Sequence, residues 1–247
     1  AGRVYAEFFP HEIGTPEEAV EFILNRVEEL REGLPERVEA HVSVHSPYTV
    51  VPVSSRLAAR RTRERGDLLA IHLSESPEEV EFVREGTGGL ANIFGRNDWG
   101  GVGVSPVRYA ESVELLAPQT IAAHLATGVS EEDIEVLART GVAVAHCPRS
   151  NEFLGCGVAP VPRMMQRGVR VGMGTDGLWS SPSMNLFEET LFAVKLHGFD
   201  GATGLRLATL EGARALGLAE ETGSLQAGKW ADLAVVEAAP GGDPERE

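Results

Sequence analysis

The chain of 247 residues has 37 acidic and 22 basic side chains, a net charge of −15, and 43% hydrophobic residues, as is typical of a globular protein. The acidic balance argues against a nucleic-acid partner, because basic side chains supply most of that affinity. No run approaches the roughly 20 apolar residues of a membrane span, so we expect no membrane partner. Two cysteines exclude a disulfide scaffold, and no secretion signal is visible, which predicts a cytoplasmic protein.

Strands and helices are predicted to alternate along the chain. The apolar runs predict strands over 3–9, 38–45, 68–73, 120–125, 142–146 and 169–174. Periodicity and capping predict helices over 15–32, 54–65, 76–85, 105–116, 130–139, 161–166, 184–197 and 202–216. Loops are expected over 86–103 and 147–157, and two short strands over 224–237. Such alternation predicts an α/β fold with a parallel sheet, either a barrel or a flavodoxin-like open sheet.

Two helix starts have the sequence of a capping box, Thr15–Glu18 and Ser76–Glu79. No strand is followed by a Gly-x-Gly-x-x-Gly turn, and no Gly-x-x-x-x-Gly-Lys-Ser/Thr loop is present. The sequence therefore gives no support to a dinucleotide-binding fold or to a phosphate-binding loop of that type.

Side chains of ligand type stand at the carboxyl end of five different predicted strands: His45, His72, His124, His146 and Asp176. In a (β/α)8 barrel this end is where catalytic residues converge. A single histidine there often only bonds a neighbouring carbonyl, but five such residues on five strands favour a shared site. Imidazole and carboxylate together suit zinc, iron or nickel, and such a metal activates water for hydrolysis.

Glu75 follows His72 by three residues, just beyond the strand. Beside a metal it is placed to carry a proton. The alternative is a carboxylate at a helix entry near Ser76, where it would only interact with the helix dipole.

Four segments resemble the amidohydrolase superfamily, in its cytosine-deaminase-like branch with the triazine hydrolases and purine nucleoside deaminases: His72–Glu75, Ala123–His124, His146–Asn151 and Gly174–Gly177. The segment Gly223–Leu233 resembles the family's return into a small β-sandwich. The resemblance implies a (β/α)8 TIM barrel of which residues 1–218 supply only strands 3–8. Residues 219–247 would then supply the return strands of the sandwich and a tail.

The resemblance also implies roles for individual residues. His72 and Asp176 would bind one divalent metal, zinc first and iron or nickel as alternatives, with His124 as a less direct ligand. Asp176 would take the proton of the attacking water, and His124 would hold that water or the leaving group. Glu75 would protonate the substrate ring nitrogen, and His45 would contact the ribose or the ring.

Segments 3–7, 45–48 and 103–109 look most like the aminodeoxyfutalosine deaminases of menaquinone biosynthesis. Methylthioadenosine and adenosylhomocysteine deaminases come second, and cytosine, guanine or triazine substrates remain further alternatives. Trp99, in the glycine-rich segment 86–103, is a candidate contact for the ligand or for a second subunit; the alternative is a surface insertion. Asn151 is a candidate that orders its loop beside the substrate. We expect a small nucleoside or heterocycle as substrate and, by analogy, a homo-oligomer.

One family signature is absent, the His-x-His of the first barrel strand, and the first two strands are missing with it. Either a stretch on the order of 120 residues precedes this sequence, scaled from the size of a strand–helix unit, or the chain is a non-catalytic remnant that acts by association. The presence of His72, Glu75, His124 and Asp176 favours the enzyme, because a remnant has no physical reason to keep four catalytic groups.

Overall fold

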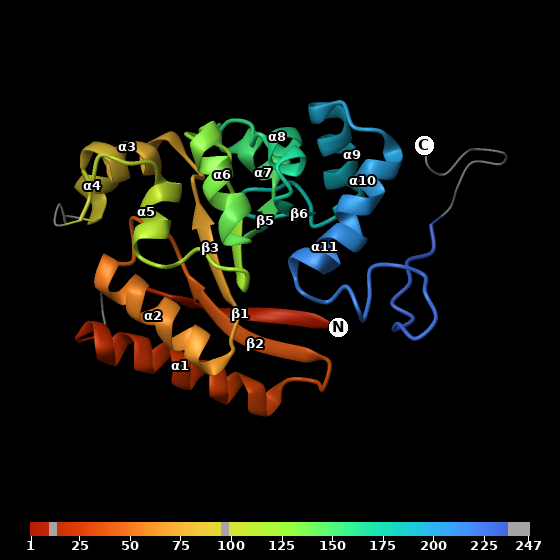
Figure 1. The fold of residues 1–247 in the computed structure, drawn as a ribbon, viewed down its shortest axis with the longest axis horizontal. Coiled ribbons are helices and arrows are strands. Elements are labelled where there is room, and N and C mark those ends of the chain that lie inside the picture. Colours follow the sequence, from red (N-terminus) through yellow and green to blue (C-terminus); the bar gives the residue numbers. More distant parts are fainter. Residues whose placement is uncertain (10–13, 95–98, 237–247) are drawn as a thin grey trace.

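The computed structural model describes residues 1–9, 14–94 and 99–236, and its centre is one parallel sheet (Figure 1). The strands are β1 (Gly2–Phe8), β2 (Val38–Val44), β3 (Leu69–Leu73), β4 (Thr120–His124), β5 (Ala143–His146) and β6 (Arg170–Met173). Each strand pairs with the next one along the chain, and all pairings are parallel. All six carboxyl ends therefore lie at one edge of the sheet, which confirms the predicted α/β fold with parallel strands.

Helices cover this sheet and connect its strands. They are α1 (Pro16–Gly33), α2 (Pro52–Arg65), α3 (Pro77–Glu85), α4 (Gly88–Phe94), α5 (Pro106–Ser112), α6 (Glu131–Thr140), α7 (Pro148–Phe153), α8 (Val161–Gln166), α9 (Leu186–His197), α10 (Gly201–Ala208) and α11 (Leu210–Ala215). Figure 1 shows α1 and α2 beside β1 and β2, and α9 to α11 gathered beside β6. Within the described residues, none of these helices is long and apolar enough to cross a membrane.

Local chemistry sets the helix ends. The predicted capping box of α1 is present, since Thr15 Oγ1 accepts the Glu18 N–H and Glu18 Oε2 accepts the Thr15 N–H. Helix α2 ends at Gly66, whose φ of 72° is left-handed and favours glycine. The strands are the buried centre of the molecule: Val42, Val44 and Leu73 have no exposed surface. Burial is most complete in β2 and β5, whereas β1, the first strand of the sheet, is buried only at Phe8.

Two expected loops contain helices. Segment 86–103 holds α4, which begins with two glycines, and segment 147–157 holds α7, a six-residue helix that starts at Pro148. Both are too short for a clear hydrophobic period. The expected helix over 202–216 is instead two helices, because Thr209, with φ −123° and ψ −93°, interrupts it.

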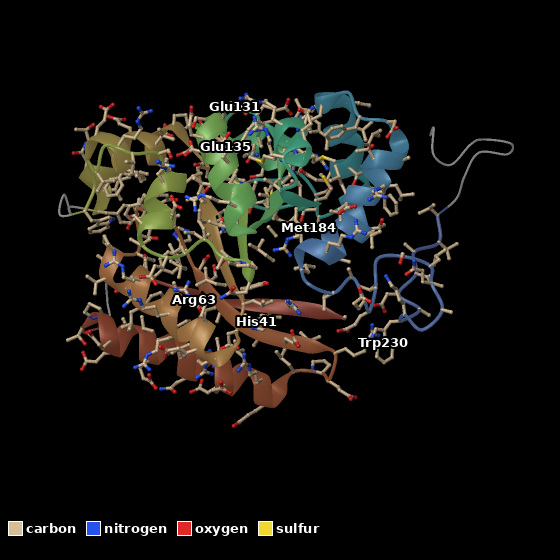
Figure 2. The ribbon with its side chains drawn as sticks, viewed as in Figure 1. His41, Arg63, Glu131, Glu135, Met184 and Trp230 are labelled. Carbon is tan, nitrogen blue, oxygen red and sulfur yellow. The ribbon has the colours of Figure 1, made fainter. Side chains whose placement is uncertain are left out.

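The strands expected over 224–237 are a further difference. Residues 224–236 contain no strand, and Glu237 lies outside the described residues. A strand is stable when its backbone groups pair with a neighbour, and residues 224–236 pair with none of the six strands of the described chain. The tail is held by other contacts: the guanidinium of Arg37 lies 4.2 Å from the ring centre of Trp230, which is labelled in Figure 2, and the Trp230 N–H donates to the Glu221 carbonyl. The expected domain boundary between 218 and 219 stays a prediction.

Candidate active site

The strand ends bring the predicted site residues together. Glu75, His124 and Asp176 each offer a ligand atom within 4.8 Å of the other two. A second group of the same kind joins Glu7, His45 and His72. The two groups are neighbours, since the rings of His72 and His124 stack with 5.5 Å between their centres.

The backbone is strained at the same edge. Five non-glycine residues in the described ranges have positive φ, and four of them follow or end the strands of the site: Ser74, His124, Leu125 and Asp176, with φ between 50° and 73°. Left-handed backbone is costly for such residues and persists where the surrounding structure imposes it, commonly at functional sites. The strain therefore marks the carboxyl edge of β3, β4 and β6 independently of the side-chain chemistry.

His124 is oriented by a residue from α7. Its side chain is 1% exposed, and its Nδ1 lies 3.0 Å from Oδ1 of Asn151. Because a carbonyl oxygen only accepts, Nδ1 donates its proton to Asn151, and Nε2 is the nitrogen left for other partners. That nitrogen faces Glu75, 3.7 Å from Oε1. Asn151 thus orders the site through His124.

Asp176 is fixed by two hydroxyl groups on one of its oxygens. Ser150 donates to Oδ2 at 2.5 Å, and Ser180 donates to the same atom. Burial alone would raise the pKa of this carboxyl, but the two hydrogen bonds and the neighbouring His124 hold the pKa below its usual value. Asp176 is therefore an ionised carboxylate with Oδ1 left for catalysis or for an ion.

Glu75 stands in a turn that a second glutamate holds. Glu79 accepts the N–H of Ser74 at Oε1 and that of Glu75 at Oε2, both at 2.8 Å. The predicted capping box over 76–79 is only half correct: Ser76 Oγ accepts the Glu79 N–H, but the Glu79 side chain does not return to Ser76. The reason is that the strained turn presents two buried N–H groups that need an acceptor. Burial raises the pKa of Glu79 to about 8, although these two bonds oppose the shift.

The neighbouring group contains His45 and His72. His72 Nδ1 lies 3.0 Å from the His45 carbonyl oxygen and 3.7 Å from Glu7 Oε1, which leaves its Nε2 available. His45 Nδ1 lies 2.8 Å from Thr49 Oγ1. Burial, and secondarily the nearby His72, lower the pKa of His45 to about 4, so this ring is neutral at pH 7.

Sequence reasoning missed several residues of the site. Glu7 could have been found, because it stands near the end of β1 as the histidines do on their strands. Ser150 lies inside the 146–151 motif, but nothing in the sequence marks it as a partner of Asp176. Ser180 and Glu79 have no signal beyond a position in a turn and in a helix start.

Two other residues lie apart from both groups. His146 is fully buried at the end of β5, and its Nε2 lies 3.0 Å from Nε2 of His197 on α9. Trp99 is 8% exposed, donates from Nε1 to the Pro47 carbonyl at 2.9 Å and meets Phe82 edge-on. Trp99 is thus packed within the chain, and its contact with a ligand or a second subunit stays a prediction. Residues 95–98 of that expected loop lie outside the described ranges.

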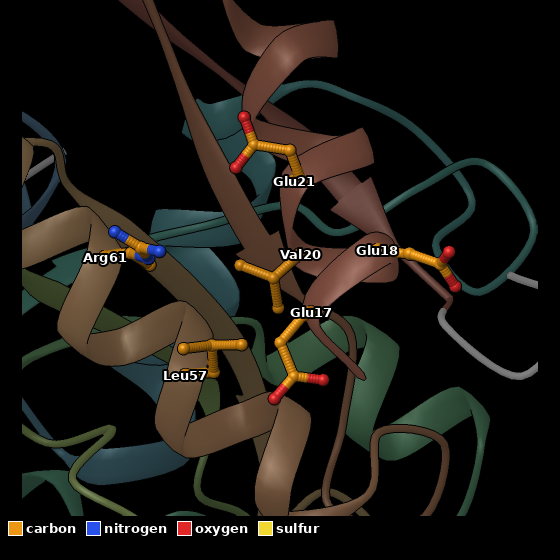
Figure 3. A pocket seen from close by; sticks show the side chains of 6 residues that line it. All are labelled: Glu17, Glu18, Val20, Glu21, Leu57 and Arg61. Atoms are coloured by element: carbon orange, nitrogen blue, oxygen red, sulfur yellow. The ribbon is translucent and has the colours of Figure 1, made fainter. Parts of the chain in front are cut away.

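The donor set fits a divalent metal. One imidazole nitrogen and carboxylate oxygens within reach of each other, with a second imidazole stacked beside them, are ligands that zinc prefers. His124 Nε2 and Asp176 Oδ1 are both left unused by their protein hydrogen bonds. A hollow between α1 and α2 has a different character, since acidic side chains, Leu57 and Arg61 line it without any histidine or cysteine (Figure 3).

The sequence model of the amidohydrolase family matches residues 3–246. The chain belongs to the amidohydrolase family. It is 36% identical over 245 residues to a 5-methylthioadenosine/S-adenosylhomocysteine deaminase of Syntrophobacter fumaroxidans, covering 96% of this chain and 52% of that protein. A protein of the same name from Thermococcus onnurineus is 32% identical, with 95% and 54% covered. This family member thus spans about half the length of the curated relatives it matches.

Solved structures agree on the fold of this amidohydrolase. An adenosine deaminase from Xanthomonas campestris with bound zinc has a TM-score of 0.75 and 26% identity, covering 94% of this chain and 50% of that one. Helicobacter pylori aminofutalosine deaminase has a TM-score of 0.83 over 98% of this chain and 62% of that one, but its 24% identity informs on the fold alone. The expected superfamily and its TIM-barrel-type architecture are confirmed.

Proposed function

We propose that this chain carries the reaction centre of a metal-dependent deaminase that releases ammonia from an adenine nucleoside, 5-methylthioadenosine or S-adenosylhomocysteine. The observation that carries the proposal is the convergence of Glu75, His124 and Asp176 at one edge of the sheet, with ligand atoms within 4.8 Å. Relatives above 30% identity bear the name of deaminases for these two substrates. Aminodeoxyfutalosine, placed first by the sequence motifs, therefore becomes the second choice.

The side chains divide the proton transfers of a hydrolytic deamination. Asp176, kept ionised by Ser150 and Ser180, accepts a proton from the attacking water at its free Oδ1. Glu75 donates a proton to the ring nitrogen beside the amino-bearing carbon. The amino group then leaves as ammonia with the proton that Asp176 had accepted, and the hydroxyl proton of the intermediate returns to Glu75. Two carboxyl groups in different surroundings thereby take the base and acid roles.

A divalent ion, zinc or in its place iron or nickel, would be held by His72, His124 and Asp176. It would supply the Lewis acidity that makes water a nucleophile at neutral pH. His45, neutral and with Nδ1 held by Thr49, directs its other nitrogen toward a substrate hydroxyl or the ring. Asn151 acts on the substrate site by orienting His124. Assembly into a homo-oligomer stays a prediction.

The test measures bound metal and ammonia release in the complete polypeptide that contains this sequence. The substrates are methylthioadenosine, adenosylhomocysteine, aminodeoxyfutalosine, adenosine, cytosine and guanine. We expect one bound divalent metal and the highest kcat/KM with one of the first two. If ammonia is released fastest from aminodeoxyfutalosine, that compound becomes the first choice of substrate again. If no metal is bound and no compound releases ammonia, the proposed enzymatic activity is contradicted. The hypothesis of a non-catalytic remnant then remains.

A further inference from the structure

The turn between β3 and α3 places Glu75, and its backbone needs an external acceptor. Strand β3 ends at Leu73 and α3 begins at Pro77, so only residues 74–76 connect them. Ser74 has a φ of 50°, a left-handed conformation that breaks the extended path of the strand. Both groups bond the two oxygens of one side chain, Glu79, at 2.8 Å.

Glu79 is unusual for a glutamate in the first turn of a helix because it is completely buried. The residue has no exposed surface, and within the described ranges no cation is among the groups that act on its carboxyl. Burial of a carboxyl without a cation is costly unless hydrogen bonds satisfy both oxygens. The two backbone donors do so, one for each oxygen, which makes the contact a two-point clamp on the turn rather than a surface cap.

The clamped turn is also tied to the turn that follows β4. The Ser74 carbonyl accepts the N–H groups of Ala126 at 2.9 Å and Thr127 at 3.0 Å. The Leu73 carbonyl accepts the Leu125 N–H at 2.9 Å, directly after His124. Fixing Ser74 therefore fixes the spacing between Glu75 and His124, whose Oε1 and Nε2 atoms are 3.7 Å apart.

We propose that Glu79 is a positioning residue: its buried carboxyl group clamps the Ser74–Glu75 backbone and thereby holds the Glu75 carboxyl against His124 in the geometry that proton transfer requires. The catalytic part of this inference rests on the proposed deaminase function. Proton donors act only within a narrow range of positions, and a displacement near 1 Å costs roughly 100-fold in rate. Glu79 itself touches neither the reacting atoms nor the metal ligands.

The test substitutes Glu79→Gln, which keeps the shape but replaces one acceptor oxygen by a donor that faces an N–H group. We expect faster amide hydrogen exchange at Ser74 and Glu75, and a kcat about 100-fold lower with KM within about threefold of wild type. If Gln does not fold, Glu79→Asp keeps two acceptors on a shorter side chain, and we expect smaller changes in the same direction.

Two control variants separate positioning from stability. Glu78→Gln makes the same chemical change at the exposed neighbouring position, and we expect wild-type exchange and kcat. Ser76→Ala removes the hydroxyl that accepts the Glu79 N–H, so α3 loses its cap while the clamp remains. We expect Ser76→Ala to lower the stability without the loss in kcat.

Each contrary outcome is distinct. Unchanged exchange at Ser74 and Glu75 in Glu79→Gln would overturn the clamp. Faster exchange with a wild-type kcat, or an equal kcat loss in Ser76→Ala, would overturn the positioning role. If the wild-type protein releases no ammonia, the proposed function fails and the catalytic part fails with it, whereas the exchange measurement still decides whether the clamp exists.

Discussion

Asp176 shows how single hydrogen bonds prepare a group for chemistry. Both serine hydroxyls bind the same oxygen, Oδ2, so the charge of the carboxylate is stabilised while Oδ1 stays available. Asp176 also has a left-handed backbone, with a φ of 57°, three residues after the end of β6. The base of the reaction is thus defined by its partners as much as by its identity.

Ser150→Ala should shift the pH dependence of the reaction. The Ser150 hydrogen bond lowers the pKa of Asp176, so its removal raises this pKa. Asp176 must be ionised to act as base, and the acid limb of the kcat profile should therefore move to higher pH. Ser112→Ala, on α5, serves as the control with an unchanged profile. An unshifted acid limb in Ser150→Ala would show that Asp176 does not determine it.

Asn151→Ala should disturb His124 without touching its ring. The variant loses the acceptor that fixes the Nδ1 proton, and loss of such a partner costs about 10- to 100-fold in metal affinity or activity. Asn151→Asp keeps an acceptor oxygen and should retain more of both. Metal content and kcat are the measurements, and equal losses in the two variants would contradict the role given to the hydrogen bond.

Among the structural elements, the strands were predictable from the sequence, whereas the shortest helices and the tertiary contacts that support the site were not. All six strands follow from apolar runs, and their carboxyl ends placed His45, His72, His124 and Asp176 at one edge. The short helices α4 and α7 were not predicted, because six or seven residues are too few to show a helical period of hydrophobic residues. Tertiary contacts such as Glu79 on the Ser74 backbone depend on burial in the folded turn, which the local sequence does not encode.

Close packing of β6 on α11 gives a prediction at this scale. A Cβ at Gly172 would lie 2.8 Å from Gly212 Cα, a backbone atom that cannot move aside. Gly172→Ala should therefore lower the free energy of unfolding by about 1–3 kcal/mol, measured by urea denaturation. Gly2→Ala on β1, where nothing lies within 4 Å of the new Cβ, is the matched control. Equal stability of the two variants would contradict the close contact.

For the whole molecule, the parallel order of the sheet explains why distant segments form one centre. The site draws on residues separated by more than 100 positions, Glu75 and Asp176, because β3 and β6 end at the same edge. The strand order also explains why sequence reasoning located the centre but not its support. The buried partners of His146 and Glu79 become visible only once the layers are assembled.

The buried His146 should make the stability of the molecule sensitive to acid. Burial, with His197 and His124 acting in the same direction, lowers its pKa from 6.5 to about 3. Between these values the unfolded chain binds one more proton than the folded chain, so the free energy of unfolding falls as the pH falls. The slope from one group is at most about 1.4 kcal/mol per pH unit.

Urea unfolding of wild type and His146→Gln over this pH range checks the prediction. The variant should show a flatter acid dependence. Glu79, whose pKa is raised from 4.5 to about 8, acts in the opposite direction but is present in both proteins. Identical slopes would mean that His146 does not remain neutral in the folded state.

The substitution Glu75→Gln tests most directly whether Glu75, His124 and Asp176 form one reaction centre. In the complete polypeptide, the variant should bind as much metal as wild type, because Glu75 is placed as the acid and not as a ligand. Its ammonia release from methylthioadenosine or adenosylhomocysteine should fall by about 10²- to 10⁴-fold, the usual contribution of acid–base catalysis. Wild-type-like ammonia release by a metal-loaded Glu75→Gln protein would contradict this centre.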